Sequence, residues 1–167
     1  MTWQQVCADK TLANLPFKIE LDKTGKIIMS PAHKKHSRLQ GHILGLLTRL
    51  MPRGDSLPEC AVETTEGTKV PDVAWISEER WASMDPADAS CSIAPEICVE
   101  VLSSTNTREE MLGTPEKPGK RELYFEAGAK EFWLCEESGQ LSFFSPSGPL
   151  PKSELCPEFP VQVYRRP

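Results

Sequence analysis

The chain has 167 residues, of which 39% are hydrophobic and 26% are charged, and its formal net charge is −5. The length suits one domain with its own core, and no apolar run approaches the ~18–20 residues that a membrane-spanning helix needs. The first residues lack the basic and apolar segments of a signal peptide, and the acidic balance argues against a protein that coats nucleic acid through a basic surface.

The six cysteines and three histidines show neither a disulfide framework nor a zinc motif. No two cysteines form a CxxC pair, and Cys98 and Cys135 lie within apolar runs, where a free thiol behaves as a small buried hydrophobe. Nothing near His33, His36 and His42 completes a set of four zinc ligands. We therefore expect reduced thiols, a cytoplasmic location and no zinc.

Strands and helices are predicted to alternate along the chain. Apolar residues at every second position indicate strands, and apolar residues at every third or fourth position indicate a helix. In chain order, the expected elements are a short helix or arm (1–14), a β-hairpin (17–21 and 26–29), a long helix that Ser30 and Pro31 open and 51–54 end, strands (60–63 and 70–76), a short helix (79–82), a strand (97–102), a helix (120–127), a second hairpin (131–135 and 141–144), and an irregular, proline-rich surface tail from Pro146. This order predicts a single domain over 1–167 with an α/β or α+β sheet flanked by helices.

Two carboxylates lie on the apolar faces of predicted strands. Because successive side chains of a strand point to opposite faces, Asp72 shares its face with Val70, Ala74 and Ile76 in the predicted strand 70–76. Glu100 likewise shares its face with Cys98 and Leu102. A buried, unpaired carboxylate is costly, so such an acid is paired, protonated or bound to a metal. A lysine or arginine partner, or exposure at a strand end, is the ordinary explanation of one such acid. Two acids on neighbouring strands favour a shared site but do not exclude that explanation.

Lys120 is a third candidate for this site. It begins the predicted helix one turn before Leu123 and Tyr124, at the edge of the face that packs inward, so its ammonium could reach the sheet. An ordinary lysine that extends into solvent from a helix start is the alternative. Basic residues could also form a phosphate-facing rim, or else a solvated helix face: Lys34, Lys35, Arg38, Lys117, Lys120 and Arg121.

Several of these segments, in this order, resemble the Uma-two family of restriction endonucleases, a branch of the PD-(D/E)XK nuclease superfamily. The resemblance covers about residues 15–145. The stretches that carry it are Ile19-Glu20-Leu21, Gly25-Lys26-Ile27, Met29-Ser30-Pro31 with His33 or His36 at the helix start, Val70-Pro71-Asp72-Val73-Ala74, and residues 95–103, 120–128 and 131–134.

The resemblance implies a restriction-endonuclease-like core, with a mixed central sheet and an N-terminal β-hairpin, that hydrolyses phosphodiester bonds of DNA. Asp72 and Glu100 would hold Mg²⁺, with Mn²⁺ as a substitute, since these hard cations prefer carboxylate oxygens. The backbone carbonyl of Val101 or Leu102 would complete the metal shell, and Glu20 is a weaker candidate ligand. The bound cation would reverse the sign of the local field, so the acidic net charge does not exclude a DNA substrate.

The resemblance also assigns the active-site lysine. The superfamily's usual lysine follows the second acid by two residues, and this position is Leu102 here. The family instead places the lysine on the next helix, at Lys120, where it would orient or activate the attacking water. Lys117, in the proline-rich segment 112–119, competes for this role.

Two other functions stay open. One is a catalytically inactive relative that acts as a DNA-binding or protein-interaction module, suggested by the acidic balance and the altered loop before Lys120. The other is a proton-transfer pair in a glycosidase-like site, which needs an aromatic-lined cleft, whereas Trp75 and Trp133 are expected to pack in the core or on the sheet. A nuclease that cuts both strands of a palindrome would act as a homodimer.

Overall fold

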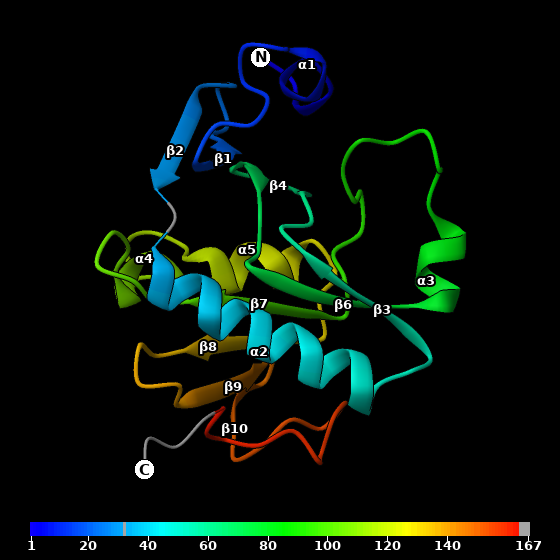
Figure 1. Cartoon of the computed structure of the whole chain (residues 1–167), viewed down its shortest axis with the longest axis vertical. Coiled ribbons are helices and arrows are strands. Elements are labelled where there is room, and N and C mark those ends of the chain that lie inside the picture. Colours follow the sequence, from blue (N-terminus) through cyan, green and yellow to red (C-terminus); the bar gives the residue numbers. More distant parts are fainter. Residues whose placement is uncertain (32, 164–167) are drawn as a thin grey trace.

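A six-stranded sheet forms the centre of the computed structural model, which describes residues 1–31 and 33–163 (Figure 1). The strand order is β10-β9-β8-β7-β6-β3, and only β7 and β8 are parallel neighbours among the described residues, so the sheet is mixed. The strands are β3 (Gly54–Pro58), β6 (Val73–Ser77), β7 (Ile97–Val101), β8 (Glu131–Cys135), β9 (Leu141–Ser145) and β10 (Gly148–Leu150).

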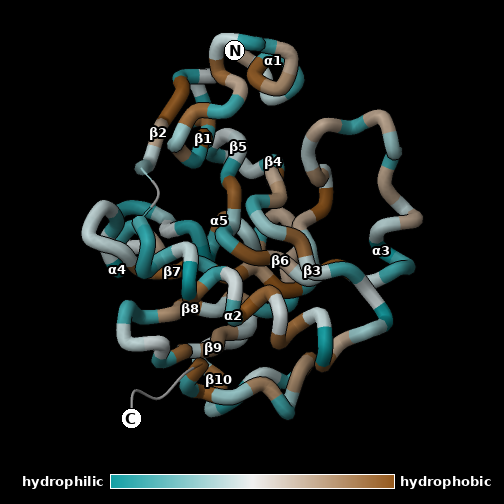
Figure 2. Tube along the Cα trace, in the orientation of Figure 1, coloured by the Kyte–Doolittle hydropathy of each residue, from teal (hydrophilic) through white to brown (hydrophobic). Residues whose placement is uncertain are grey.

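Helices cover both faces of this sheet. Helix α2 (Lys34–Leu50) crosses the near face in Figure 1 and buries Leu39, Ile43 and Leu47, whose spacing of four residues places them on one side of the helix. On the opposite face, α4 (Arg108–Leu112) and α5 (Lys120–Glu126) pack with the alternate side chains of β7 and β8. In Figure 2 the hydrophobic colour accordingly follows β6, whereas the segment around α4 is mostly hydrophilic.

Two small hairpins lie beside the central sheet and do not pair with its strands. One consists of β1 (Phe17–Leu21) and β2 (Ile27–Pro31), and the other of β4 (Val62–Thr64) and β5 (Gly67–Lys69). Gly25 closes the first hairpin at a φ of +78°, a conformation that glycine adopts without strain. The two remaining short helices are α1 (Trp3–Ala8) and α3 (Glu78–Ser83). No helix of the described residues is long and apolar enough to cross a membrane.

The predicted fold class is confirmed, and so are the two predicted hairpins and the helix at 120–127. The predicted start of the long helix is wrong: α2 begins at Lys34 after His33, because β2 stays paired with β1 as far as the Phe17–Pro31 pair. Proline is tolerated at the end of this edge strand, where no ladder hydrogen bond from its nitrogen is needed.

The prediction of an irregular surface tail is only partly correct. Residues 151–163 form no helix or strand, but Gly148–Leu150 pairs with β9, and Cys156 and Phe159 are buried in the core on the face that α2 covers. Phe159 is buried there against Trp133, with ring centroids 4.6 Å apart. Strand β3 was not predicted, since its sequence Gly-Asp-Ser-Leu-Pro has no apolar alternation and its stability comes from pairing with β6.

Candidate active site

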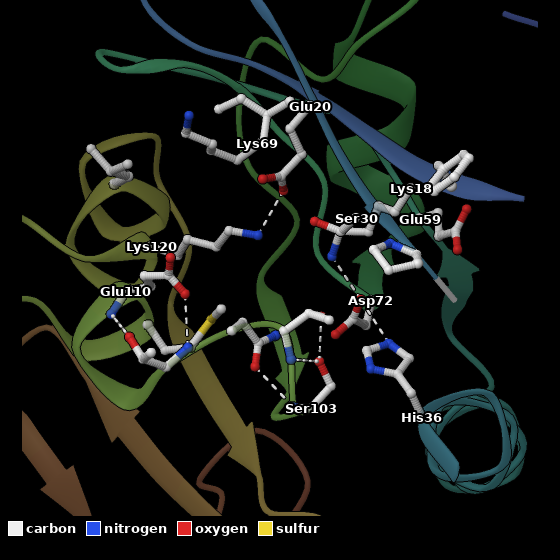
Figure 3. A pocket seen from close by; sticks show the side chains of 18 of the residues that line it. Lys18, Glu20, Ser30, His36, Glu59, Lys69, Asp72, Ser103, Glu110 and Lys120 are labelled. Atoms are coloured by element: carbon white, nitrogen blue, oxygen red, sulfur yellow. Dashed lines mark hydrogen bonds and ion pairs between the residues drawn. The ribbon is translucent and has the colours of Figure 1, made fainter. Parts of the chain in front are cut away.

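A cavity of about 590 Å³ opens between the N-terminal hairpin, the start of α2, the loop after β7 and the start of α5 (Figure 3). Its lining is rich in charged side chains. Lys18, Glu20, His36, Asp72 and Lys120 all line it: the first two come from β1, and the other three come from α2, from the residue before β6 and from the start of α5. The sequence-predicted acids and Lys120 are thus brought together by the fold.

Asp72 lies immediately before β6, one residue beyond the Val73–Val99 pair, so the antiparallel register places it opposite Glu100. Its Oδ2 atom accepts a hydrogen bond of 2.7 Å from the backbone N–H of Val101. Its Oδ1 atom accepts one of 2.7 Å from the ammonium of Lys18 and lies 3.1 Å from Nε2 of His36. One oxygen is therefore anchored to the sheet, and the other faces cationic side chains.

Glu100 is fully buried on β7, and its two carboxylate oxygens also have different partners. Its Oε1 atom accepts hydrogen bonds from the hydroxyl of Tyr124 at 2.7 Å and from Nζ of Lys120 at 3.0 Å. Its Oε2 atom accepts from Nζ of Lys18 at 3.3 Å. Asp72 Oδ1 and Glu100 Oε2 therefore both contact the same ammonium nitrogen, that of Lys18.

Lys120 is held by acids on two sides. Besides Glu100, its Nζ contacts Oε1 of Glu20 at 2.6 Å, and that oxygen also accepts the backbone N–H of Val70 at 2.8 Å. Lys117 lines the same cavity from the loop before α5, but of these two candidate lysines it is Lys120 whose ammonium contacts Glu100.

Burial and charge act against each other in this cluster. Burial by itself raises the pKa of Asp72, yet the Lys18 ammonium and His36 outweigh it and hold that pKa well below the usual range of an aspartate. For Glu100 burial dominates and raises the pKa, opposed by Lys120 and Lys18. Burial lowers the pKa of Lys120, but Glu100 and Glu20 more than compensate and raise it above that of an ordinary lysine, so Lys120 is cationic at neutral pH.

The donor atoms suit a hard divalent cation. No group of three or more His, Cys, Asp or Glu side chains within residues 1–31 and 33–163 is arranged to hold a metal. However, Mg²⁺ is commonly bound by one or two carboxylates and several waters, and two carboxylate oxygens already converge on one cation here. The Val101 carbonyl lies on the same side of its strand as the N–H that contacts Asp72, and it accepts from Asn106 Nδ2 at 3.3 Å.

Three members of the cluster were not assigned to it from the sequence: Lys18, His36 and Tyr124. The alternation of β1 carried a signal, because Lys18 and Glu20 are two residues apart and therefore share a face. Tyr124 follows Lys120 by one helical turn, which places both on the same side of α5. His36 was named with the resemblance only as a residue of the helix start, and its contact with Asp72 depends on how α2 packs.

The predicted basic rim is only partly present at the cavity. Lys117 and Lys120 line it, whereas the guanidinium of Arg121 donates to Glu122 and to the carbonyl of Leu112 and lies 5.1 Å from the ring centroid of Phe144. Lys34 and Lys35 are exposed at the start of α2. Trp75 and Trp133 are buried in the core, as expected, and so supply no aromatic wall for a sugar.

Comparisons with known proteins identify a family and a similar fold. The model of a family described as "Uma2: Putative restriction endonuclease" matches residues 6–159, a wider range than the resemblance seen in the sequence. A crystal structure described as "a putative nuclease belonging to DUF820", from Anabaena variabilis, is similar with a TM-score of 0.70 and 16% sequence identity, over 98% of this chain and 95% of that chain. No curated protein matches the chain. At 16% identity the structural likeness concerns the fold.

Proposed function

The chain belongs to the Uma2 family of restriction-endonuclease-like proteins, and on this premise we propose that it is a Mg²⁺-dependent endonuclease that hydrolyses phosphodiester bonds of DNA. The observation that carries the proposal is the convergence of Asp72 Oδ1 and Glu100 Oε2 on a single cationic nitrogen. Two buried carboxylates aimed at one point beside a cavity form a site for a divalent cation, and phosphodiester hydrolysis is a reaction that such a site supports.

Asp72 and Glu100 would hold the metal, with the Val101 carbonyl as a third oxygen and Mn²⁺ as a substitute ion. Bound there, Mg²⁺ would polarise the scissile phosphate and lower the pKa of a coordinated water. The chain's own contacts keep both carboxylates in place: the Val101 N–H holds Oδ2 of Asp72, and the Tyr124 hydroxyl holds Oε1 of Glu100. This leaves the two cation-facing oxygens with a fixed direction, which reduces the reorganisation needed on binding.

We assign to Lys120 the role of orienting the attacking water and contacting the phosphate. Its ammonium lies at the cavity wall and is fixed between Glu100 and Glu20, so it can orient a water and stabilise negative charge that develops on phosphate oxygens. Glu20 serves in this proposal as the positioning residue of Lys120, because its Oε1 atom is already bound by Lys120 and by the Val70 N–H.

The test is plasmid nicking by the purified protein with Mg²⁺ or Mn²⁺. Asp72→Asn and Glu100→Gln keep the size of the side chains and remove the ligand charge, and each should reduce the rate by at least about 100-fold. Glu59→Gln is the matched control, because Glu59 is an exposed acid on the wall of the same cavity. Full activity of both site variants, with the fold verified by circular dichroism, would refute the assignment.

A second candidate is a non-catalytic DNA-binding or protein-interaction module of the same fold. It is favoured by one observation: every carboxylate of the cluster already has an ammonium partner, so the cluster is stable without a metal. Calorimetric titration separates the two functions. Heat of Mg²⁺ or Mn²⁺ binding at millimolar concentration supports the nuclease, and its absence in a folded protein supports the module.

A further inference from the structure

The ammonium of Lys18 occupies the position between the two carboxylates of the site. It lies 2.7 Å from Asp72 Oδ1 and 3.3 Å from Glu100 Oε2, and its side chain is only 15% exposed. Of the two cation-facing oxygens, that of Glu100 is bound by Lys18 and that of Asp72 by Lys18 and His36. Lys18 is therefore the cation on which both carboxylates converge in this state of the protein.

A metal ion held by these two oxygens needs the space that the ammonium fills. An ammonium and a divalent cation also repel each other strongly at such short range inside a protein, where the effective dielectric constant is low. The two cations are thus alternatives for one position. We infer that Lys18 is the resident counter-cation of the site and that its side chain leaves the carboxylates when a divalent metal binds; this inference rests on the proposed function.

The surroundings of Lys18 allow this exchange without unfolding. Lysine has a flexible four-carbon side chain, so the ammonium can move by several ångströms while the backbone stays in place. Lys18 itself lines the cavity of about 590 Å³, which gives the displaced ammonium an aqueous place to go (Figure 3). The backbone of β1 keeps other attachments, since Glu20 contacts Val70 and Lys120, and the carbonyl of Leu21 accepts from Lys69.

The displaced ammonium would remain beside the site. Lys18 lies on the same strand face as Glu20, and the cavity wall also carries His36 and Lys120. An ammonium that leaves the carboxylates for this wall becomes available to a phosphate group there. The exchange therefore converts a buried ion pair of the metal-free protein into a phosphate contact of the metal-loaded protein.

The exchange predicts that the native lysine weakens metal binding. Competition lowers the apparent affinity by the fraction of molecules in which the site is free of the ammonium. Lys18→Met keeps an unbranched side chain that is one atom shorter and removes the competing charge. Calorimetry with Mn²⁺ or Mg²⁺ should then give a dissociation constant at least about fivefold lower than that of the wild type, and the metal should raise the melting temperature of Lys18→Met more than that of the wild type.

Lys69→Met is the matched control, because it removes a neighbouring charge from the same cavity wall, while the Lys69 ammonium contacts the Leu21 carbonyl and neither carboxylate of the pair. Its metal affinity should stay within about twofold of the wild type. If Lys18→Met binds metal no more tightly than the wild type, although the wild type binds metal and nicks DNA, the exchange is refuted and the nuclease stands. If neither protein binds metal, the exchange and the proposed function both fall. Binding by Lys18→Met alone would show that Lys18 excludes the metal from the native protein, which overturns the exchange and supports the non-catalytic module.

Discussion

Two buried carboxylates lie at opposite ends of the parallel strands β7 and β8, and they are stabilised by different kinds of partner. Glu131, at the start of β8, is 2% exposed, and Glu100, near the end of β7, is fully buried. Glu131 accepts hydrogen bonds from Trp133 Nε1, from the hydroxyl of Ser153 and from the backbone N–H groups of 154 and 155, at 2.7 to 2.8 Å. Glu100 instead receives two ammonium groups and a tyrosine hydroxyl.

These partners make Glu131 a structural carboxylate and leave Glu100 in a site that can exchange one cation for another. The donors of Glu131 are neutral, and two of them belong to the backbone, so they cannot leave without moving the segment after β10. The ammonium groups beside Glu100 are at the ends of flexible side chains and line a cavity. A buried acid that accepts hydrogen bonds from backbone groups stabilises the fold, whereas Glu100, one of whose cations is the flexible Lys18 side chain beside a cavity, can accept another cation in its place.

We expect the largest effect, a loss of stability, from replacing the structural carboxylate Glu131. Glu131→Ala leaves the Trp133 indole N–H, the Ser153 hydroxyl and two backbone N–H groups without their acceptor in the core. Hydrogen bonds to a charged group contribute about 1.5–3 kcal/mol each and are not additive, so we expect the free energy of unfolding to fall by about 3–5 kcal/mol. Urea denaturation measures it. The metal affinity of the folded fraction should stay unchanged, and a loss below about 1 kcal/mol would contradict the structural role.

The next largest effect tests whether Lys120 or Lys117 is the active-site lysine. Lys120→Met removes the ammonium fixed between Glu20 and Glu100, and the rate of DNA nicking should fall by about 100- to 1,000-fold, the range found when one preorganised donor to developing charge is removed. Lys117→Met should change the rate by less than about threefold. The reverse order of the two variants would assign the role to Lys117.

The smallest effects are expected from removing one hydroxyl donor from each of the two carboxylates, Glu100 and Glu131. Tyr124→Phe removes a donor to Glu100, and Ser153→Ala removes a donor to Glu131, so each should lower the free energy of unfolding by about 1–2 kcal/mol. Only Tyr124→Phe should also weaken Mn²⁺ binding, by a few-fold, because it loosens a proposed ligand. Equal metal affinities of the two variants would show that the hydroxyl of Tyr124 does not position Glu100.

The sequence by itself determined the elements whose physics is local. The alternation in 17–21 and the four-residue spacing of Leu39, Ile43 and Leu47 follow from the geometry of single strands and helices. Alternation also assigned Asp72 and Glu100 to apolar faces without knowledge of their neighbours, although the strand predicted at 70–76 begins only at Val73 and Asp72 lies immediately before it. These patterns, together with the resemblance, were sufficient to predict the fold class.

Only the tertiary structure decided which groups meet. Strands β3 and β10 depend on hydrogen bonds to β6 and β9, and neither carries an alternating pattern of its own. Lys18 meets Asp72 across 54 positions of sequence and Glu100 across 82, and no local rule selects such partners. The choice between Lys117 and Lys120 likewise depends on how α5 packs against β7. The sequence therefore placed two acids on apolar faces, and the packing of distant elements decided that both are buried and that two lysines neutralise them.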